Sequence, residues 1–224
     1  ALDRDSGTVA WRTPRPPMAS PKWSFGTPLV IDVEGKLQLV SPAAQMVCSY
    51  DPASGKEVWR VRYPNKWSIV PRPVFSHGLV FIFTGYPGSA ELLAIRPTGS
   101  GDVTESHVAW RTGKNVPQIP SPLIVRNEIF LVSNDGIASC RDVTSDTLHW
   151  RHRIGGSFSA SPVYADGRIY FQSEEGLTTV IEPGTTFHEL ARNELDGRTL
   201  ATPAVSNGSI FIRTNSHLYR IATD

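Results

Sequence analysis

Apolar and polar residues alternate along the chain in short runs separated by glycine-containing turns. One example lies between Pro162 and Phe171, where two alternating runs flank the turn Asp166-Gly167. Alternation with a period of two predicts half-buried strands, and Asp-Gly supplies the positive backbone dihedral φ of a tight hairpin. The same arrangement recurs with turns at 34–35, 77–78 and 207–208. The pattern predicts an all-β protein built from hairpins.

Each predicted hairpin starts at a proline that follows a short polar or basic residue. These are Pro28, Pro73, Pro122, Pro162 and Pro203, and successive ones are 40 to 49 residues apart. Proline has no N–H to donate, so it suits the first residue of a strand. The prolines therefore mark the start of the first strand in each of several repeated units.

A motif that ends in tryptophan repeats as well, with copies at residues 1–11, 49–59 and 140–150. The first two copies share Asp, Ser and Gly at matching positions, whereas the third has Asp146 in place of the glycine. A tryptophan can lay a flat apolar surface between adjacent units, and a glycine lets the neighbouring backbone come close. We expect a structural role for Trp11, Trp59, Trp110, Trp150, Gly7 and Gly55.

The repeats predict four-stranded units at about 28–62, 73–112, 122–153 and 162–192, with the first three strands of a fifth at 203–222. Four antiparallel strands in 40 to 50 residues are typical of a β-propeller blade. Residues 98–102 are interpreted as an insertion before the last strand of the second unit, and Glu189-Leu190 as the replacement of the tryptophan in the fourth. Residues 7–12 either complete the fifth unit or end a missing one; the start within a unit favours a fragment of a single propeller domain.

Composition excludes several classes of partner. The chain has 22 Lys and Arg against 21 Asp and Glu, so its net charge of +1 gives no field that would attract nucleic acid or an anionic membrane surface. It has no run of about 18 apolar residues, and its N-terminus lacks the pattern of a signal peptide. Cys48 and Cys140 are expected to be free, partly buried thiols. We predict a monomer with no membrane span.

No catalytic or metal site is predicted. His149 and His152 would point to opposite faces of a strand, which prevents joint ligation of a metal. The aspartates of the repeated motif, Asp3, Asp51 and Asp142, are interpreted as hydrogen-bond acceptors within its turn. No phosphate-binding loop, nucleophile elbow or pair of carboxylates at catalytic spacing occurs. We therefore predict no cofactor and favour a noncatalytic protein.

The connections between units carry the candidate binding residues. Lys-Trp-Ser occurs in two of them, directly before a predicted first strand, and Arg72 replaces the usual Ser or Thr before the proline. Such aromatic rings could line the mouth of a central channel and bind a sugar ring or an extended peptide. Alternatively, they plug the channel or cover the first strand. The candidates are Lys22, Trp23, Lys66, Trp67, Arg72, Gln118 and Phe158.

The motif Ala-x-Asp-x-x-(Ser/Thr)-Gly-x-x-x-Trp resembles the tryptophan-docking repeat of the PQQ-like β-propellers, which include quinoprotein alcohol dehydrogenases and the BamB-like proteins. The resemblance covers essentially the whole chain and is strongest in the copies ending at Trp11 and Trp59. The Ser/Thr-Pro starts and residues 211–221 resemble the PQQ-binding-like repeat proteins that are abundant in planctomycetes. Since those proteins have seven or eight blades, the chain would be a C-terminal portion.

The resemblance implies an extracytoplasmic scaffold or recognition module for a protein or carbohydrate ligand. The alternative that it raises is a PQQ-dependent quinoprotein oxidoreductase with Ca²⁺, acting on alcohols or sugars. None of that enzyme's catalytic residues can be assigned to a position in this sequence, so they would lie in missing blades.

Overall fold

The computed structural model describes residues 1–16, 23–86, 88 and 90–222. Every regular element within these residues is a strand, which confirms the all-β class. The chain divides into two compact units, residues 1–111 and 112–224, and each is treated separately below.

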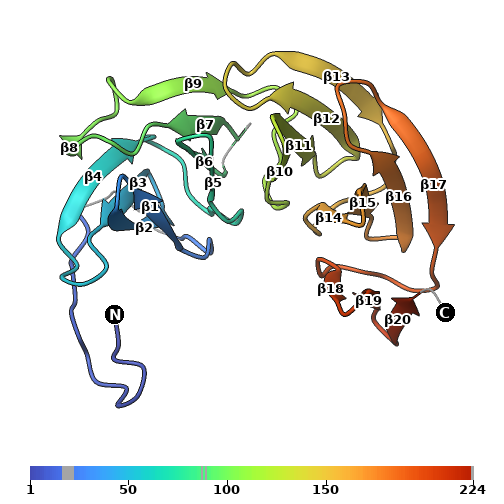
Figure 1. Cartoon of the computed structure of the whole chain (residues 1–224), viewed down its shortest axis with the longest axis horizontal. Coiled ribbons are helices and arrows are strands. Elements are labelled where there is room, and N and C mark those ends of the chain that lie inside the picture. The colour runs from blue at the N-terminus through green and yellow to red at the C-terminus, as the bar shows by residue number, and fades with distance from the viewer. Residues whose placement is uncertain (17–22, 87, 89, 223–224) are drawn as a thin grey trace. The chain divides into compact units, whose positions relative to one another are not determined.

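Unit 1 contains two sheets, labelled in Figure 1. The first has the order β1 (Leu29–Val33), β2 (Lys36–Ala43), β3 (Met46–Tyr50), β4 (Glu57–Arg62), β8 (Gly101–Asp102). The second has the order β5 (Val74–Ser76), β6 (Leu79–Phe83), β7 (Leu92–Ile95), β9 (Val108–Thr112). The short strand β8 comes from the insertion between β7 and β9, yet it pairs in parallel with β4 of the other sheet, opposite Trp59 and Arg60.

Unit 2 contains three sheets of consecutive antiparallel hairpins. The first consists of β10 (Leu123–Val125), β11 (Glu128–Val132), β12 (Ile137–Asp142) and β13 (Leu148–Arg153). The second consists of β14 (Val163–Ala165), β15 (Arg168–Gln172), β16 (Leu177–Glu182) and β17 (His188–Glu194). The third has β18 (Ala204–Ser206), β19 (Ser209–Arg213) and β20 (Leu218–Ala222). Such meanders of four strands are the blades of a β-propeller.

The hairpin turns have the backbone that the sequence predicts. Asp166 and Gly167 have φ of 47° and 73°, and Asn207 and Gly208 have 47° and 69°. Two consecutive positive φ angles are the requirement of a tight type I′ turn, whose twist matches that of the flanking strands. These turns therefore determine the register of β14 with β15 and of β18 with β19.

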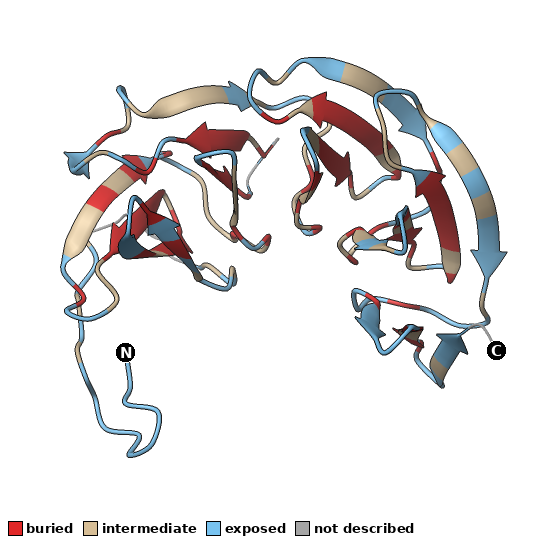
Figure 2. Ribbon diagram, in the orientation of Figure 1, coloured by how far each residue is buried: buried red, intermediate tan, exposed pale blue. Residues whose placement is uncertain are grey.

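The middle strands of the sheets carry the core. All five residues of β6 are buried, whereas β17 alternates between exposed and half-buried positions (Figure 2). In unit 1 the cluster around the fully buried Trp59 joins valines and isoleucines of both sheets. In unit 2 a second cluster joins β11 and β12 to β15 and β16. Burial of apolar surface between successive sheets is what holds repeated blades together.

The tryptophan position in the sheet β14–β17 is a correction to the sequence analysis. Trp150 pairs with Cys140 just before a β-bulge, and Ala191 pairs with Val180 just before the corresponding bulge. Ala191, rather than Glu189-Leu190, therefore stands where the preceding sheet has its tryptophan. The bulge is common to both sheets, but the chain from the end of β16 to Ala191 is one residue longer than the chain from the end of β12 to Trp150, which spacing alone does not reveal.

The aspartates of the repeated motif accept hydrogen bonds within their turns, as expected. The Asp142 carboxylate accepts from the backbone N–H groups of Thr144 and Ser145 and from both hydroxyls, at 2.7–2.9 Å. These bonds favour the charged form and lower the pKa of Asp142 from 3.8 to about 2.

Replacement of Asp142 by Asn should change the acid stability of the protein. Because the pKa is lowered by folding, the carboxylate contributes stability that is present above about pH 4 and is lost as the pH falls towards 2. The denaturation midpoint of the wild type should therefore fall more steeply over this range than that of Asp142→Asn, measured by denaturant titration at each pH. Equal slopes would show that the turn does not depend on the charge.

Candidate functional site

Four aromatic side chains from three loops of unit 1 form what we term the aromatic loop group: Trp23, Phe25, Trp67 and Tyr86. Trp23, Phe25 and Tyr86 are 62%, 64% and 52% exposed, and Trp67 is half-buried. Large apolar side chains that are exposed on neighbouring loops commonly mark an interaction site. The group is the most conspicuous exposed apolar feature of the candidate loops.

Backbone hydrogen bonds hold the three loops together. Trp67 and Tyr86 exchange two N–H···O bonds of 2.5 and 2.8 Å, and their rings meet edge to face at 6.4 Å. Ser68 N–H donates to the Trp23 carbonyl at 2.8 Å, and Phe25 N–H donates to the carbonyl of the buried Ile69 at 2.7 Å. The exposed rings therefore stand on an ordered backbone, which lowers the entropy lost on binding.

The sequence analysis identified part of this group. It named Trp23 and Trp67, which the structure brings together, and Lys66, which is half-buried beside them; Lys22 lies outside the described residues. Phe25 and Tyr86 were not among the candidates. The signal in the sequence for a special loop was the presence of glycines near Tyr86. In the structure, Gly85 has φ of +70°, and an added Cβ there would lie 2.5 Å from the Trp67 carbonyl oxygen.

The structure corrects the prediction that Phe158 is a binding residue. It is only 2% exposed and belongs to the apolar cluster of unit 2, where its N–H donates to the Asn134 carbonyl at 2.9 Å. A ring buried in this way fills the space between sheets and cannot contact a ligand. The interpretation of Phe158 as a binding residue therefore does not fit the structure.

Two further candidate binding residues lie elsewhere in the structure. Gln118 is half-buried in unit 2, and its backbone N–H donates to Asn134 Oδ1 at 2.9 Å. Arg72 is exposed in unit 1 and lines a pocket of about 420 Å³ with residues of β1 and β5. Neither lies in the aromatic loop group as defined here.

The tryptophans of the repeated motif contact the turn of the following sheet. Trp11 Nε1–H donates to the Pro52 carbonyl and Trp150 Nε1–H donates to the Gly184 carbonyl, both at 2.9 Å. A Cβ added at Gly55 would overlap the Trp11 ring, which explains the glycine there, whereas Gly7 has nothing within 4 Å and a φ of +70°. The positive φ alone favours glycine at position 7.

Trp59 and Trp110 differ from that pattern. Trp59 is fully buried and donates to Gln38 Oε1 at 2.7 Å, while Gln38 Nε2 donates onward to the Pro97 carbonyl at 3.1 Å. Gln38 thus links the tryptophan to the other sheet of unit 1. Trp110 lies 5.7 Å from the Phe81 ring, and among the described residues its buried Nε1 has no hydrogen-bond partner.

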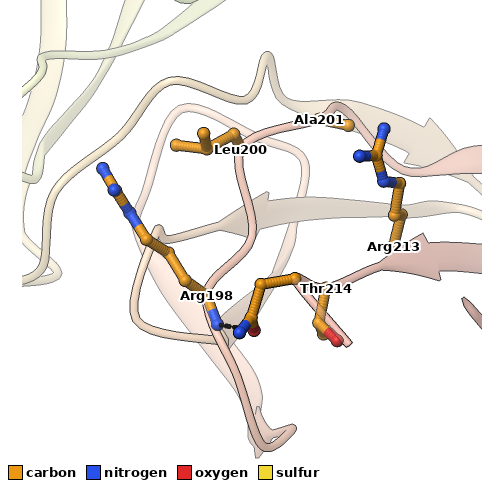
Figure 3. A pocket seen from close by; sticks show the side chains of 6 residues that line it. Arg198, Leu200, Ala201, Arg213 and Thr214 are labelled. Carbon is orange, nitrogen blue, oxygen red and sulfur yellow. Dashed lines mark hydrogen bonds between the residues drawn. The ribbon is translucent and has the colours of Figure 1, made fainter. Parts of the chain in front are cut away.

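Unit 2 contains a pocket of about 330 Å³ that the sequence analysis did not identify (Figure 3). Arg198 and Arg213 stand on its opposite sides, and Leu200 and Ala201 supply an apolar wall. The loop that carries Arg198 is held to the loop that carries Asn215: Arg198 N–H donates to Asn215 Oδ1 at 3.0 Å, and Asn215 N–H donates to the Arg198 carbonyl at 2.9 Å.

The Arg198 guanidinium also pairs with Glu174 at 2.5 Å, which lowers the pKa of that carboxyl. Two guanidinium groups suit a carboxylate or a phosphate. No spacing in the sequence marks the pocket, since its two arginines are 15 positions apart on a connection and a strand.

Two observations concern metal and thiol chemistry in the part of the chain that the structure describes. There, no group of three or more His, Cys, Asp or Glu side chains could hold a metal ion. Cys48 and Cys140 are free and buried, as expected, and burial raises the pKa of Cys140 to about 12. Within the same residues, no helix is long and apolar enough to cross a membrane.

A family model described as outer membrane protein assembly factor BamB matches residues 1–138. The chain belongs to this family. Together with the sheets described above, the match makes it a PQQ-like repeat β-propeller protein of the BamB family. The resemblance read from the motif copies is thereby confirmed. No curated protein matches the chain.

Solved structures share the fold of the chain. BamB from Moraxella catarrhalis has a TM-score of 0.68 at 12% identity, over 95% of this chain and 62% of that protein. The computationally designed Ika8 protein has a TM-score of 0.62 at 9% identity, over 86% of this chain and 57% of the design. The chain therefore spans about three fifths of the length of these two proteins.

An enzyme shares the fold as well. Quinohemoprotein alcohol dehydrogenase from Comamonas testosteroni has a TM-score of 0.56 at 13% identity, over 74% of this chain and 34% of the enzyme. Likenesses at such identities concern the fold alone, because one fold supports many functions.

Proposed function

We propose that this BamB-family chain is a noncatalytic, extracytoplasmic recognition module that binds an extended polypeptide segment through the aromatic loop group. The observation that carries the proposal is the exposure of Trp23, Phe25 and Tyr86 on loops that backbone hydrogen bonds hold together. The family's description as an outer membrane protein assembly factor supports both the location and a polypeptide ligand.

The ligand chemistry follows from the rings. Trp and Tyr offer large rigid contact areas at low entropic cost and are common at protein interfaces. A strand destined for an outer membrane alternates apolar and polar residues and carries aromatic residues near its ends. In extended form, such a segment presents apolar side chains on one side, which the exposed rings can contact.

Replacement of Trp23 by Ala should weaken peptide binding at least tenfold without unfolding the protein. The probe is a synthetic ten-residue peptide of alternating apolar and polar residues with a Phe near each end, followed by isothermal titration calorimetry. Loss of one buried aromatic contact corresponds to about 1.4 kcal/mol or more. Since the Trp23 side chain is 62% exposed, the melting temperature should stay close to that of the wild type.

The matched control is Tyr164→Ala, which removes an aromatic ring that is 42% exposed in unit 2 and should leave binding unchanged. A cello-oligosaccharide serves as the second probe. If the wild type binds the sugar but not the peptide, and Trp23→Ala no longer binds the sugar, the ligand is a glycan and not a polypeptide.

The alternative, a PQQ-dependent oxidoreductase, is favoured only by the fold of the dehydrogenase neighbour. The described residues do not fit PQQ with Ca²⁺: no three acidic side chains gather at one place, and Cys48 and Cys140 are separate buried thiols. We therefore propose no cofactor. A specific rise in melting temperature on addition of PQQ and Ca²⁺ would contradict this.

A further inference from the structure

The two junctions between successive sheets of unit 2 have the same backbone connections, so their residues can be compared position by position. Ile154 N–H donates to the Gly136 carbonyl at 2.9 Å in the first junction, and Leu195 N–H donates to the Gly176 carbonyl at 3.1 Å in the second. Likewise, Phe158 N–H donates to the Asn134 carbonyl and Thr199 N–H donates to the Glu174 carbonyl. Thr199 therefore occupies in the second junction the position of Phe158 in the first.

Two further aromatic residues are replaced in the second junction. Ala191 stands in the position of Trp150, as the pairing with β16 and β12 shows. Ile212 stands in the position of Phe171, since the hairpins β14–β15 and β18–β19 have the same register. Phe158, Trp150 and Phe171 all belong to the apolar cluster that fills the first junction. The second junction thus lacks three of the rings that fill the first.

Of the three replacements, Ile212 lines the space left open in the second junction, whereas Ala191 and Thr199 do not. A pocket of about 250 Å³ lies between the sheet β14–β17 and the sheet β18–β20. Its apolar lining is Tyr170, Leu195, Pro203, Ile210, Ile212 and Ile221. Thr178 and Asn193 add two polar groups; the Thr178 hydroxyl already donates to Gln172 Oε1 at 2.6 Å, whereas Asn193 is exposed at the surface.

We propose that this pocket binds the aromatic ring of a ligand, with an indole as the fitting size. An apolar cavity of about 150 Å³ is known to take up benzene, so a cavity of this volume holds a two-ring system. Asn193, which lines the pocket, has a side-chain carbonyl that is an acceptor for a ring N–H. The ring belongs either to a free aromatic compound or to a side chain of a polypeptide, and the site does not depend on the aromatic loop group of unit 1.

Free indole is the first probe and N-acetyl-Ala-Trp-Ala-amide the second, each titrated into the whole chain and followed by NMR. Saturable shifts of the methyl signals of Ile210, Ile212 and Ile221 are expected with indole, together with a rise in melting temperature. Stronger binding of the peptide assigns the ring to a polypeptide, and binding of indole alone assigns it to a free compound.

Ile212→Phe restores the ring that stands at the corresponding position of the first junction and should abolish these shifts. Leu190→Phe is the matched control, because Leu190 is exposed on β17 and does not line the pocket. If Ile212→Phe does not fold, the wild-type methyl shifts still locate the ligand. Absence of shifts at these isoleucines with both probes, or unchanged binding in a folded Ile212→Phe variant, would overturn the proposal.

Discussion

Replacement of Gly176 by Ala should destabilise the protein by about 3 to 5 kcal/mol. Gly176 has φ of +92°, a conformation that costs a residue with a Cβ about 1 to 2 kcal/mol. In addition, the new Cβ would overlap the Leu195 carbonyl oxygen, which is backbone and cannot rotate away. The Leu195 N–H bond to the Gly176 carbonyl holds the connection at this place, so relief of the overlap would break that bond.

Substitutions at two other glycines distinguish the cost of the positive φ from the cost of the overlap. Gly167 has φ of +73° but nothing within 4 Å of an added Cβ, so Gly167→Ala should lose only about 1 kcal/mol. Gly184 has open space and no positive φ, so Gly184→Ala should stay within about 0.5 kcal/mol of the wild type. The midpoints of urea unfolding measure the stability of all three variants. A Gly176 variant as stable as the Gly167 variant would show that the connection is free to move.

Replacement of Trp59 by Ala should cost about 3 to 5 kcal/mol. The ring is fully buried in the core of unit 1, and its N–H is bonded to Gln38 Oε1. Removal leaves a cavity between the two sheets and takes one partner from Gln38, which keeps its bonds to Ser49 and to the Pro97 carbonyl. Trp59→Phe, which retains most of the ring, should lose about 1 to 2 kcal/mol.

The control for this substitution is Trp23→Ala, the same change at a side chain that is 62% exposed. It should change the free energy of unfolding by no more than about 0.5 kcal/mol. Equal losses at both positions, in thermal or urea unfolding, would mean that Trp23 is held by contacts with the core.

The sequence was most informative where a structural requirement is local. Positive φ at Asp166-Gly167 and the turn-stabilising role of Asp142 follow from residue types and neighbours a few positions away. The motif copies likewise located Trp59 and Trp150, because the same turn recurs with the same spacing. The resemblance to the PQQ-like β-propellers rests on that regularity.

Features that depend on tertiary contacts escaped prediction. The insertion 98–102 has no apolar alternation, so nothing in it indicates a strand on β4. Phe158 and Trp23 occupy comparable connections, yet one is buried and the other exposed, a difference that only the surrounding side chains decide. Tyr86 joins Trp67 through backbone bonds between loops about 20 positions apart, which no periodicity reveals.

The parallel pairing of β8 with β4 has a consequence for how unit 1 opens. In most repeat proteins each unit bonds within itself and touches its neighbours only through side chains. Here a loop that belongs to the second sheet supplies a backbone strand to the first, and Arg62 pairs with Asp102 at 2.7 Å beside it. Separation of the two sheets must therefore break main-chain hydrogen bonds as well as apolar contacts, which makes unit 1 a single cooperative unfolding unit.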